Sequence, residues 1–189
     1  LIELSIEALN DLLNDDAATE FSIREAIRSV QQEITDNKRK FPSEKQVHVL
    51  EARFSELIDD HRTALTALEK SFEESDREPH LAIRLASLLV AEANFDKAEE
   101  VFKQALERRR ADHKLNFHYA EFLRNNSKPS HEDLMYFYRR AFTPGDGNYQ
   151  AQFWYARYAF NLTDAKIQQE VKGIFEGLRK ARLPHSAKV

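Results

Sequence analysis

The spacing of apolar residues along this chain predicts a protein built from helices. Apolar side chains recur every three or four residues, which places them on one face of an α-helix, and there is no convincing strand pattern. Stretches rich in Asn, Ser, Pro or Gly interrupt this pattern. The pattern predicts ten helices, near residues 1–14, 20–38, 44–58, 60–76, 80–92, 95–111, 113–126, 131–142, 148–161 and 164–181.

One predicted boundary leaves two alternatives open. Residues 58–61 read Ile-Asp-Asp-His, which could form a turn between two helices or lie within one long helix. The chain also begins at Leu1 rather than at Met, inside a pattern that is already helical. We therefore expect the chain to be a piece of a longer protein.

The chain repeats one short pattern of residues. "NFHYAEFLRNN" runs from Asn116 to Asn126, and "QFWYARYAFNL" begins 36 residues later at Gln152. A self-match at a period of roughly 20 to 50 residues indicates a repeat architecture, in which similar helical units stack on one another. Both copies carry Ala at the same place, as Ala120 and Ala156. A small residue there lets two helices approach closely.

The stretch 80–112, "HLAIRLASLLVAEANFDKAEEVFKQALERRRAD", resembles a tetratricopeptide repeat (TPR), a unit of two antiparallel helices. The family's small and large positions fall on six residues here: Leu85, Ala86, Leu89, Ala98, Phe102 and Ala105. Related positions recur in the other repeats as Ala52, Ala64, Leu68 and Ser71, as Ala120, Leu134, Tyr138 and Ala141, and as Ala156, Val171, Phe175 and Leu178. The resemblance implies an all-α, TPR-like α-solenoid of antiparallel helix pairs.

The resemblance divides the chain into three parts. Residues 45–181 form the array of about four repeats, roughly 45–78, 79–112, 113–148 and 149–181, with small insertions in the last two. Residues 1–44 form a divergent helical pair or cap, and residues 182–189 a flexible tail. The sequence departs from the family at the first small position of each repeat. TPR proteins usually have Gly at this position, whereas all four repeats here have Ala.

In TPR proteins the first helix of each repeat lines a concave groove that receives a peptide or a partner helix. Carried over by position, the candidate partner-binding residues are Val49, Arg53, Ile83, Ser87, Phe117, Glu121, Arg124, Phe153, Arg157 and Phe160. The remaining groove positions are Gln46, Glu56, His80, Val90, Lys114 and Gln150.

The implied groove carries an apolar ridge of Val49, Ile83, Phe117 and Phe153 between charges of both signs. Such a surface suits an apolar peptide or an amphipathic helix. It does not suit the clamp for a terminal carboxylate that chaperone-binding TPR proteins use. The alternative is that Phe117 and Phe153 are core residues in a register shifted by one position.

Composition narrows the class of protein. The 189 residues are 42% hydrophobic and 32% charged, which is sufficient for a buried core, and the net charge of −4 gives no overall attraction to nucleic acid or to an acidic membrane. No apolar stretch is long enough to cross a bilayer. Without cysteine there can be no disulfide framework. We expect a soluble, cytoplasmic protein that does not bind membranes.

The sequence shows no convincing catalytic or metal-binding motif, so we expect neither enzymatic activity nor a cofactor. The seven histidines are scattered, and none has the spacing of a zinc site on a helix. His48 and Glu51 lie one helical turn apart and are two possible metal ligands. Two such side chains without further ligands are usually solvated and bind no metal. The turn at 143–148 lacks the Lys and Ser or Thr of a phosphate-binding loop.

Basic clusters at 38–40, 108–110, 139–140 and 179–182 fall at the ends of predicted second helices. Cations there complement the helix dipole, and we favour this explanation over a nucleic-acid surface. The predicted function is therefore a protein-interaction module, with self-association left open. Two alternatives stay open: the sensor or regulatory region of a larger signalling NTPase, and an RNA-processing scaffold of the half-a-TPR type, which "FWYARYAF" at 153–160 resembles.

Overall fold

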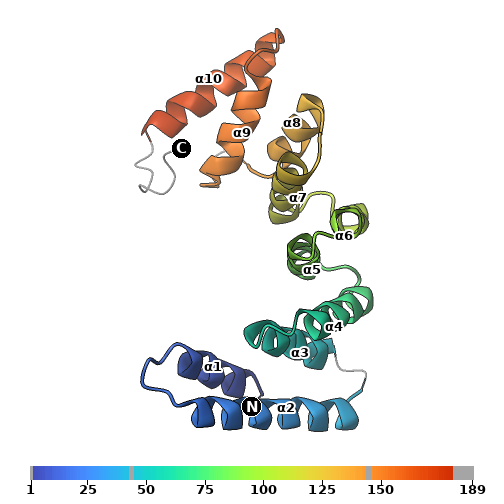
Figure 1. Ribbon diagram of the computed structural model, residues 1–189. Helices are drawn as coiled ribbons and strands as arrows, with labels where there is room; N and C mark the ends of the chain where they lie inside the picture. The colour runs from blue at the N-terminus through green and yellow to red at the C-terminus, as the bar shows by residue number, and fades with distance from the viewer. Residues whose placement is uncertain (1, 43–44, 144–145, 181–189) are drawn as a thin grey trace. The chain divides into compact units, whose positions relative to one another are not determined.

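The structure, a computed structural model, describes residues 2–42, 45–143 and 146–180. The described residues form ten helices and no strand (Figure 1). The helices are α1 (Ile2–Leu13), α2 (Glu20–Lys40), α3 (Lys45–Leu57), α4 (His61–Glu74), α5 (Pro79–Ala91), α6 (Phe95–Arg108), α7 (His113–Asn126), α8 (His131–Arg140), α9 (Tyr149–Ala159) and α10 (Ala165–Lys180).

The predicted helices are confirmed, with boundaries within three residues of the observed ones. Residues 1, 44 and 181, at which three of the predictions begin or end, lie outside the described ranges, as does the predicted tail. The open question at residues 58–61 is decided in favour of a turn. Asp59 adopts a left-handed conformation with φ of 58°, and the Asp60 carboxylate accepts a hydrogen bond from the Thr63 amide at 3.1 Å.

Polar residues fix where several helices begin. A side-chain oxygen accepts a hydrogen bond from the amide of the third helical residue and so satisfies one of the unpaired donors of the first turn. The residues that do this are Thr19 for α2, Asp60 for α4, Asp112 for α7, Ser130 for α8 and Asn148 for α9. These local signals agree with the apolar spacing, which explains why the boundaries could be predicted from sequence.

The chain divides into two compact units between Asn94 and Phe95. The N-terminal unit contains α1 to α5 and the C-terminal unit contains α6 to α10. This division falls between the two helices of the predicted repeat 79–112.

In the N-terminal unit, α1 and α2 pack against α3. Their core joins Ile2, Ile6 and Leu9 of α1 to Val30 and Ile34 of α2, and Phe54 of α3 completes it. Figure 1 shows α1 lying alongside α2. Residues 2–40 thus form a helical pair whose apolar face is buried on the first helix of the array, the arrangement by which a stacked repeat shields its core.

The small residues predicted at the helix crossings are fully buried. The exposed fraction is 0% for Ala52, Ala64, Ala86, Ala98, Ala105, Ala120, Ala141 and Ala156. Zero exposure at all of these positions means that the register taken from the sequence matches the packing. Phe175 differs from its equivalents in the other repeats, because it is 37% exposed while Tyr138 of α8 is fully buried. In the part of the chain that the structure describes, no helix follows α10 to cover it.

Aromatic side chains fill the core of the C-terminal unit. The ring of Phe102 lies 5.4 Å from that of Tyr119 and 5.5 Å from that of Phe122, and Tyr119 meets Phe137 edge-on at 4.7 Å. These contacts join α6, α7 and α8. Such tilted and edge-on pairs add to the stability that the buried area supplies.

No helix in the described ranges combines the length and the apolar character that a membrane span requires.

Ala120 offers a direct test of this packing. Replacing Ala120 by Leu should lower the free energy of unfolding by about 1 to 3 kcal/mol, because the crossing has no room for the larger side chain. Urea denaturation followed by circular dichroism measures the change. The matched control is Ala165→Leu at the exposed start of α10, which should leave stability nearly unchanged. Equal stability of both variants would show that the crossing is loosely packed.

Candidate partner-binding groove

In the N-terminal unit, two of the four candidate residues line a cavity. Val49 and Arg53 of α3 face it, together with Glu3 of α1 and Leu81 of α5, and its volume is about 420 Å³. A guanidinium nitrogen of Arg53 lies 2.8 Å from a carboxylate oxygen of Glu3, so its charge is compensated within the chain.

The other two candidates of this unit lie on α5. Ile83 is half-buried, and the hydroxyl of exposed Ser87 donates a hydrogen bond to the Ile83 carbonyl at 2.8 Å. This hydrogen bond lies within α5 and leaves the Ser87 side chain exposed.

In the C-terminal unit, Phe117 of α7 and Phe153 of α9 are half-buried. They are neither core residues in a shifted register nor fully exposed side chains. The core positions beside them are occupied by Asn116 and Gln152, which are 1% and 9% exposed. Both phenylalanines therefore stand at the edge of the buried face, and part of each ring is exposed.

Glu121 and Arg124 are engaged in a network between α7 and α8. A guanidinium nitrogen of Arg124 lies 2.7 Å from a carboxylate oxygen of Glu121, and its Nε donates a hydrogen bond to the hydroxyl of Tyr138 at 3.2 Å. That hydroxyl in turn donates to Glu121. The hydrogen bond with Glu121 raises the pKa of Arg124. Because each member has a partner inside the chain, the network has little capacity left for a ligand.

Trp154 of α9 lies between two guanidinium groups. The guanidinium of Arg124 is 4.5 Å from the centre of the Trp154 ring system, and that of Arg157 is 5.5 Å away. Both distances fall within the range of a cation–π contact. Arg157 is exposed and has no carboxylate partner among the residues that the structure describes. Its guanidinium is thus exposed beside the Trp154 ring.

Three tyrosines are held in their neutral form. Burial, and then the hydrogen bond to Glu121, raises the pKa of Tyr138 well above its ordinary value. Burial and the neighbouring Glu99 do the same to the pKa of Tyr119. For Tyr155, burial and a hydrogen bond to Glu170 raise the pKa to about 12.

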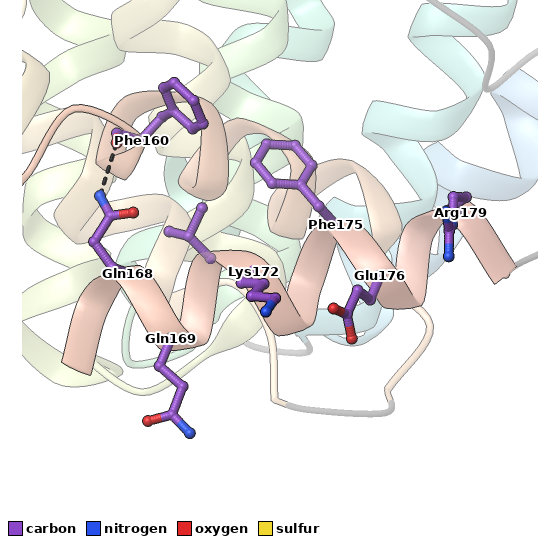
Figure 2. Close-up of a pocket in the computed structure, with 8 residues that line it drawn as sticks. Phe160, Gln168, Gln169, Lys172, Phe175, Glu176 and Arg179 are labelled. Carbon is purple, nitrogen blue, oxygen red and sulfur yellow. Dashed lines mark hydrogen bonds between the residues drawn. The ribbon is translucent and has the colours of Figure 1, made fainter. Parts of the chain in front are cut away.

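Phe160, the last candidate, lies at the C-terminal end of α9 and is 60% exposed. It lines a cavity of about 690 Å³ with Val171, Lys172, Phe175 and Arg179 of α10. Figure 2 shows the rings of Phe160 and Phe175 on the same side of α10, and their centres are 6.4 Å apart. Phe160 therefore belongs to the end surface of the C-terminal unit.

The basic cluster at residues 139–140 makes contacts within the chain. Arg139 pairs with Glu170 at 2.9 Å and lies over the ring of Phe142. Arg140 donates hydrogen bonds to the Arg110 carbonyl and lies over the ring of Tyr136. These contacts give both arginines a structural role beyond the effect of the helix dipole.

The pair of possible metal ligands singled out from sequence does not form a metal site with neighbouring side chains. His48 is buried, and its Nδ1 lies 3.7 Å from a carboxylate oxygen of Glu51, which is also bound by Lys38. Across the described ranges, no group of three or more His, Asp or Glu side chains is placed to hold a metal ion.

Sequence reasoning did not include Trp154 and Tyr158 among the groove residues. Their rings stack at 6.0 Å, and both also stack on Tyr138. Their spacing of four residues, one turn apart on the same helix face, was the available signal.

The sequence profile of the tetratricopeptide repeat family matches residues 59–121. These residues are tetratricopeptide repeats. The matched segment extends from the turn before α4 to the middle of α7 and contains the stretch from which the resemblance was inferred. None of the curated proteins matches the chain.

Solved structures of TPR proteins share the fold over nearly the whole chain. MamA residues 41 to the end, from Desulfovibrio magneticus RS-1, is 11% identical with a TM-score of 0.59, and the match covers 96% of this chain and 97% of that one. YrrB, described as a TPR protein with an unusual peptide-binding site, is 12% identical with a TM-score of 0.59, covering 98% and 96%. The predicted all-α, TPR-like α-solenoid is therefore confirmed.

The raised pKa values predict that stability falls in alkaline solution. The folded pKa of Tyr155 exceeds its ordinary value of 10.0, so its contribution is complete below pH 10 and is lost as the pH rises toward about 12, because only the unfolded chain releases the proton in that interval. Tyr119 and Tyr138 act in the same direction.

Urea denaturation at several pH values, combined with phenolate absorbance, measures this loss. Tyr155→Phe should make the decline of stability between pH 10 and 12 shallower, whereas Tyr136→Phe at an exposed position should not. Ionisation of all six tyrosines near pH 10 in a chain that remains folded would contradict the prediction.

Proposed function

We propose that this chain is a non-enzymatic protein-interaction module that binds a peptide or partner helix on the exposed face of its first helices. The observation that carries the proposal is the edge formed by half-buried Phe117, Phe153 and Trp154 beside exposed Arg157. Partly exposed aromatic rings next to an available cation are typical of protein interfaces. The shared fold with TPR proteins, one of which has a peptide-binding site, supports this proposal.

The geometry favours a partner with one apolar anchor and one carboxylate. The rings of Phe117 and Phe153 offer apolar surface for the anchor, while Arg157 can form a bidentate pair with the carboxylate. Arg124 and Glu121 contribute mainly by holding Trp154 in place, since both are already paired. An amphipathic helix or an extended segment with one acidic residue near an aromatic one meets these requirements.

Selection of displayed peptides on the intact chain tests this proposal. The enriched peptides should combine a large apolar residue with an acidic one. Phe117→Ala with Phe153→Ala should weaken binding of a synthetic enriched peptide by about tenfold or more, because aromatic anchors dominate such interfaces. Arg157→Glu should weaken acidic peptides selectively.

The matched control for this test is Phe21→Ala, which removes a ring that is 74% exposed on α2 and is not one of the candidate groove residues. Melting curves verify that each variant is folded. Enriched peptides that bind the groove variants as tightly as the unchanged chain would overturn the proposal.

One observation favours the RNA-scaffold alternative. Tyr136 is 52% exposed, and the guanidinium of Arg140 lies 5.3 Å from its ring centre. Lys103 and Arg110 line the adjoining cavity of about 370 Å³. An exposed aromatic ring among cations can stack on a base and pair with phosphates.

Titration with labelled single-stranded RNA distinguishes this alternative from peptide binding. If it holds, binding weakens steeply with added salt, because each phosphate contact releases counterions. Lys103→Glu with Tyr136→Ser should then abolish binding, while Arg139 and Arg140 stay unchanged to preserve their internal contacts. If our proposal holds instead, RNA binds only weakly. Peptide binding is then weakened by the substitutions at Phe117, Phe153 and Arg157 and not by those at Lys103 and Tyr136. The other alternative, the sensor or regulatory region of a larger signalling NTPase, stays a prediction.

A further inference from the structure

The outer face of α8 is covered by the first helix of the next repeat. Tyr138 of α8 stacks on Trp154 at 6.3 Å and on Tyr158 at 6.1 Å, both from α9. Phe142, just after α8, meets Tyr155 at 5.8 Å. These contacts show which positions of a second helix contact the helix that follows it.

At the same positions of α10, Phe175 and Arg179 are exposed, while Gln168 is half-buried and Val171 is buried. Residues 131, 134, 138 and 142 correspond to 168, 171, 175 and 179 by the shift of 37 that relates Tyr138 to Phe175. All four of the later residues line the cavity of about 690 Å³ beside Phe160 (Figure 2). This cavity therefore has the position and the lining residues of a site on α10 where the first helix of another repeat would pack.

At the other end of the chain, α1 presents the matching surface. Its buried residues Ile2, Ile6 and Leu9 repeat the spacing of buried Gln152, Ala156 and Ala159 in α9. In this register Leu4 takes the position of Trp154, and Ala8 takes that of Tyr158. Leu4 is 66% exposed, and Ala8 is also exposed, because no described helix precedes α1.

The charges around these two surfaces are opposite. Glu7 and Asp11 lie three and seven residues after Leu4, on the same face of α1. They also line a cavity with Arg53 and Arg84, which are paired with Glu3 and Glu56. Lys172 and Arg179 flank the cavity on α10, with Glu176 as the acidic residue between them. Within the described ranges, neither Glu7 nor Asp11 pairs with a cation, and neither Lys172 nor Arg179 pairs with a carboxylate.

The geometry points to head-to-tail self-association, in which α1 of a second copy occupies this site on α10. Leu4 of the second copy packs against Phe175 and Phe160, as Trp154 packs against Tyr138, and its acidic face meets Lys172 and Arg179. The two contact surfaces differ, so the interface is heterologous and each added copy leaves one surface free. Charge complementarity and the internal α8–α9 contact favour a second copy as the occupant.

Sedimentation velocity over a range of concentrations tests this inference with the 189-residue chain. The mean mass should rise with concentration beyond that of a monomer. Leu4→Asp and Phe175→Asp should each weaken self-association by about tenfold or more, because each places a charge in the apolar contact. An equimolar mixture of the two variants should form a one-to-one dimer, since each variant retains the surface that the other has lost.

Two controls separate this contact from nonspecific association. Tyr136→Asp changes an exposed aromatic residue outside both surfaces and should associate like the unchanged chain. Circular dichroism verifies the folding of each variant, and the sites of substitution are already exposed. A chain that stays monomeric at all concentrations, or a mixture of the two variants that does not pair, would overturn the inference. A pairing that survives Leu4→Asp with Phe175→Asp in the same chain would assign it to another surface.

Discussion

The close approach of helices at small buried residues is the constraint on which the rest of this structure depends. Ala at the crossings has no exposed surface, so neighbouring backbones come together until their large side chains interlock. That contact sets the rotation of each first helix about its axis. Once the rotation is set, the same stripe of every first helix is turned away from the core.

The candidate groove follows from this rotation. Phe117 and Phe153 stand at the edge of the buried face because Ala120 and Ala156, three residues further along each helix, lie in the crossing. Charged side chains at the next positions then meet the neighbouring helix. Arg124 reaches Glu121, Tyr138 and Trp154, and this pairing holds the aromatic edge in place. Arg157 is not held in this way and is exposed.

Stacking also determines what happens at the ends of the described array. Each internal second helix of the C-terminal unit is covered by a following helix, and Phe175 shows what an equivalent position looks like without one. The exposed Leu4 at the other end is the counterpart of a residue that is packed internally. Two surfaces pack together wherever neighbouring repeats meet. Each end of a repeat array exposes one of these two surfaces.

The sequence by itself determined the helices and the register of the small residues, but it left open the turn at residues 58–61, which the structure decided. These features are local, because apolar spacing, capping oxygens and the absence of a side chain beyond Cβ act within one or two turns. It also placed Phe117 and Phe153 on one stripe. Only the tertiary structure decided which charges are already paired, such as Arg53 with Glu3 and Arg139 with Glu170. Long side chains find partners on other helices, and their distance in space cannot be read from their spacing in sequence.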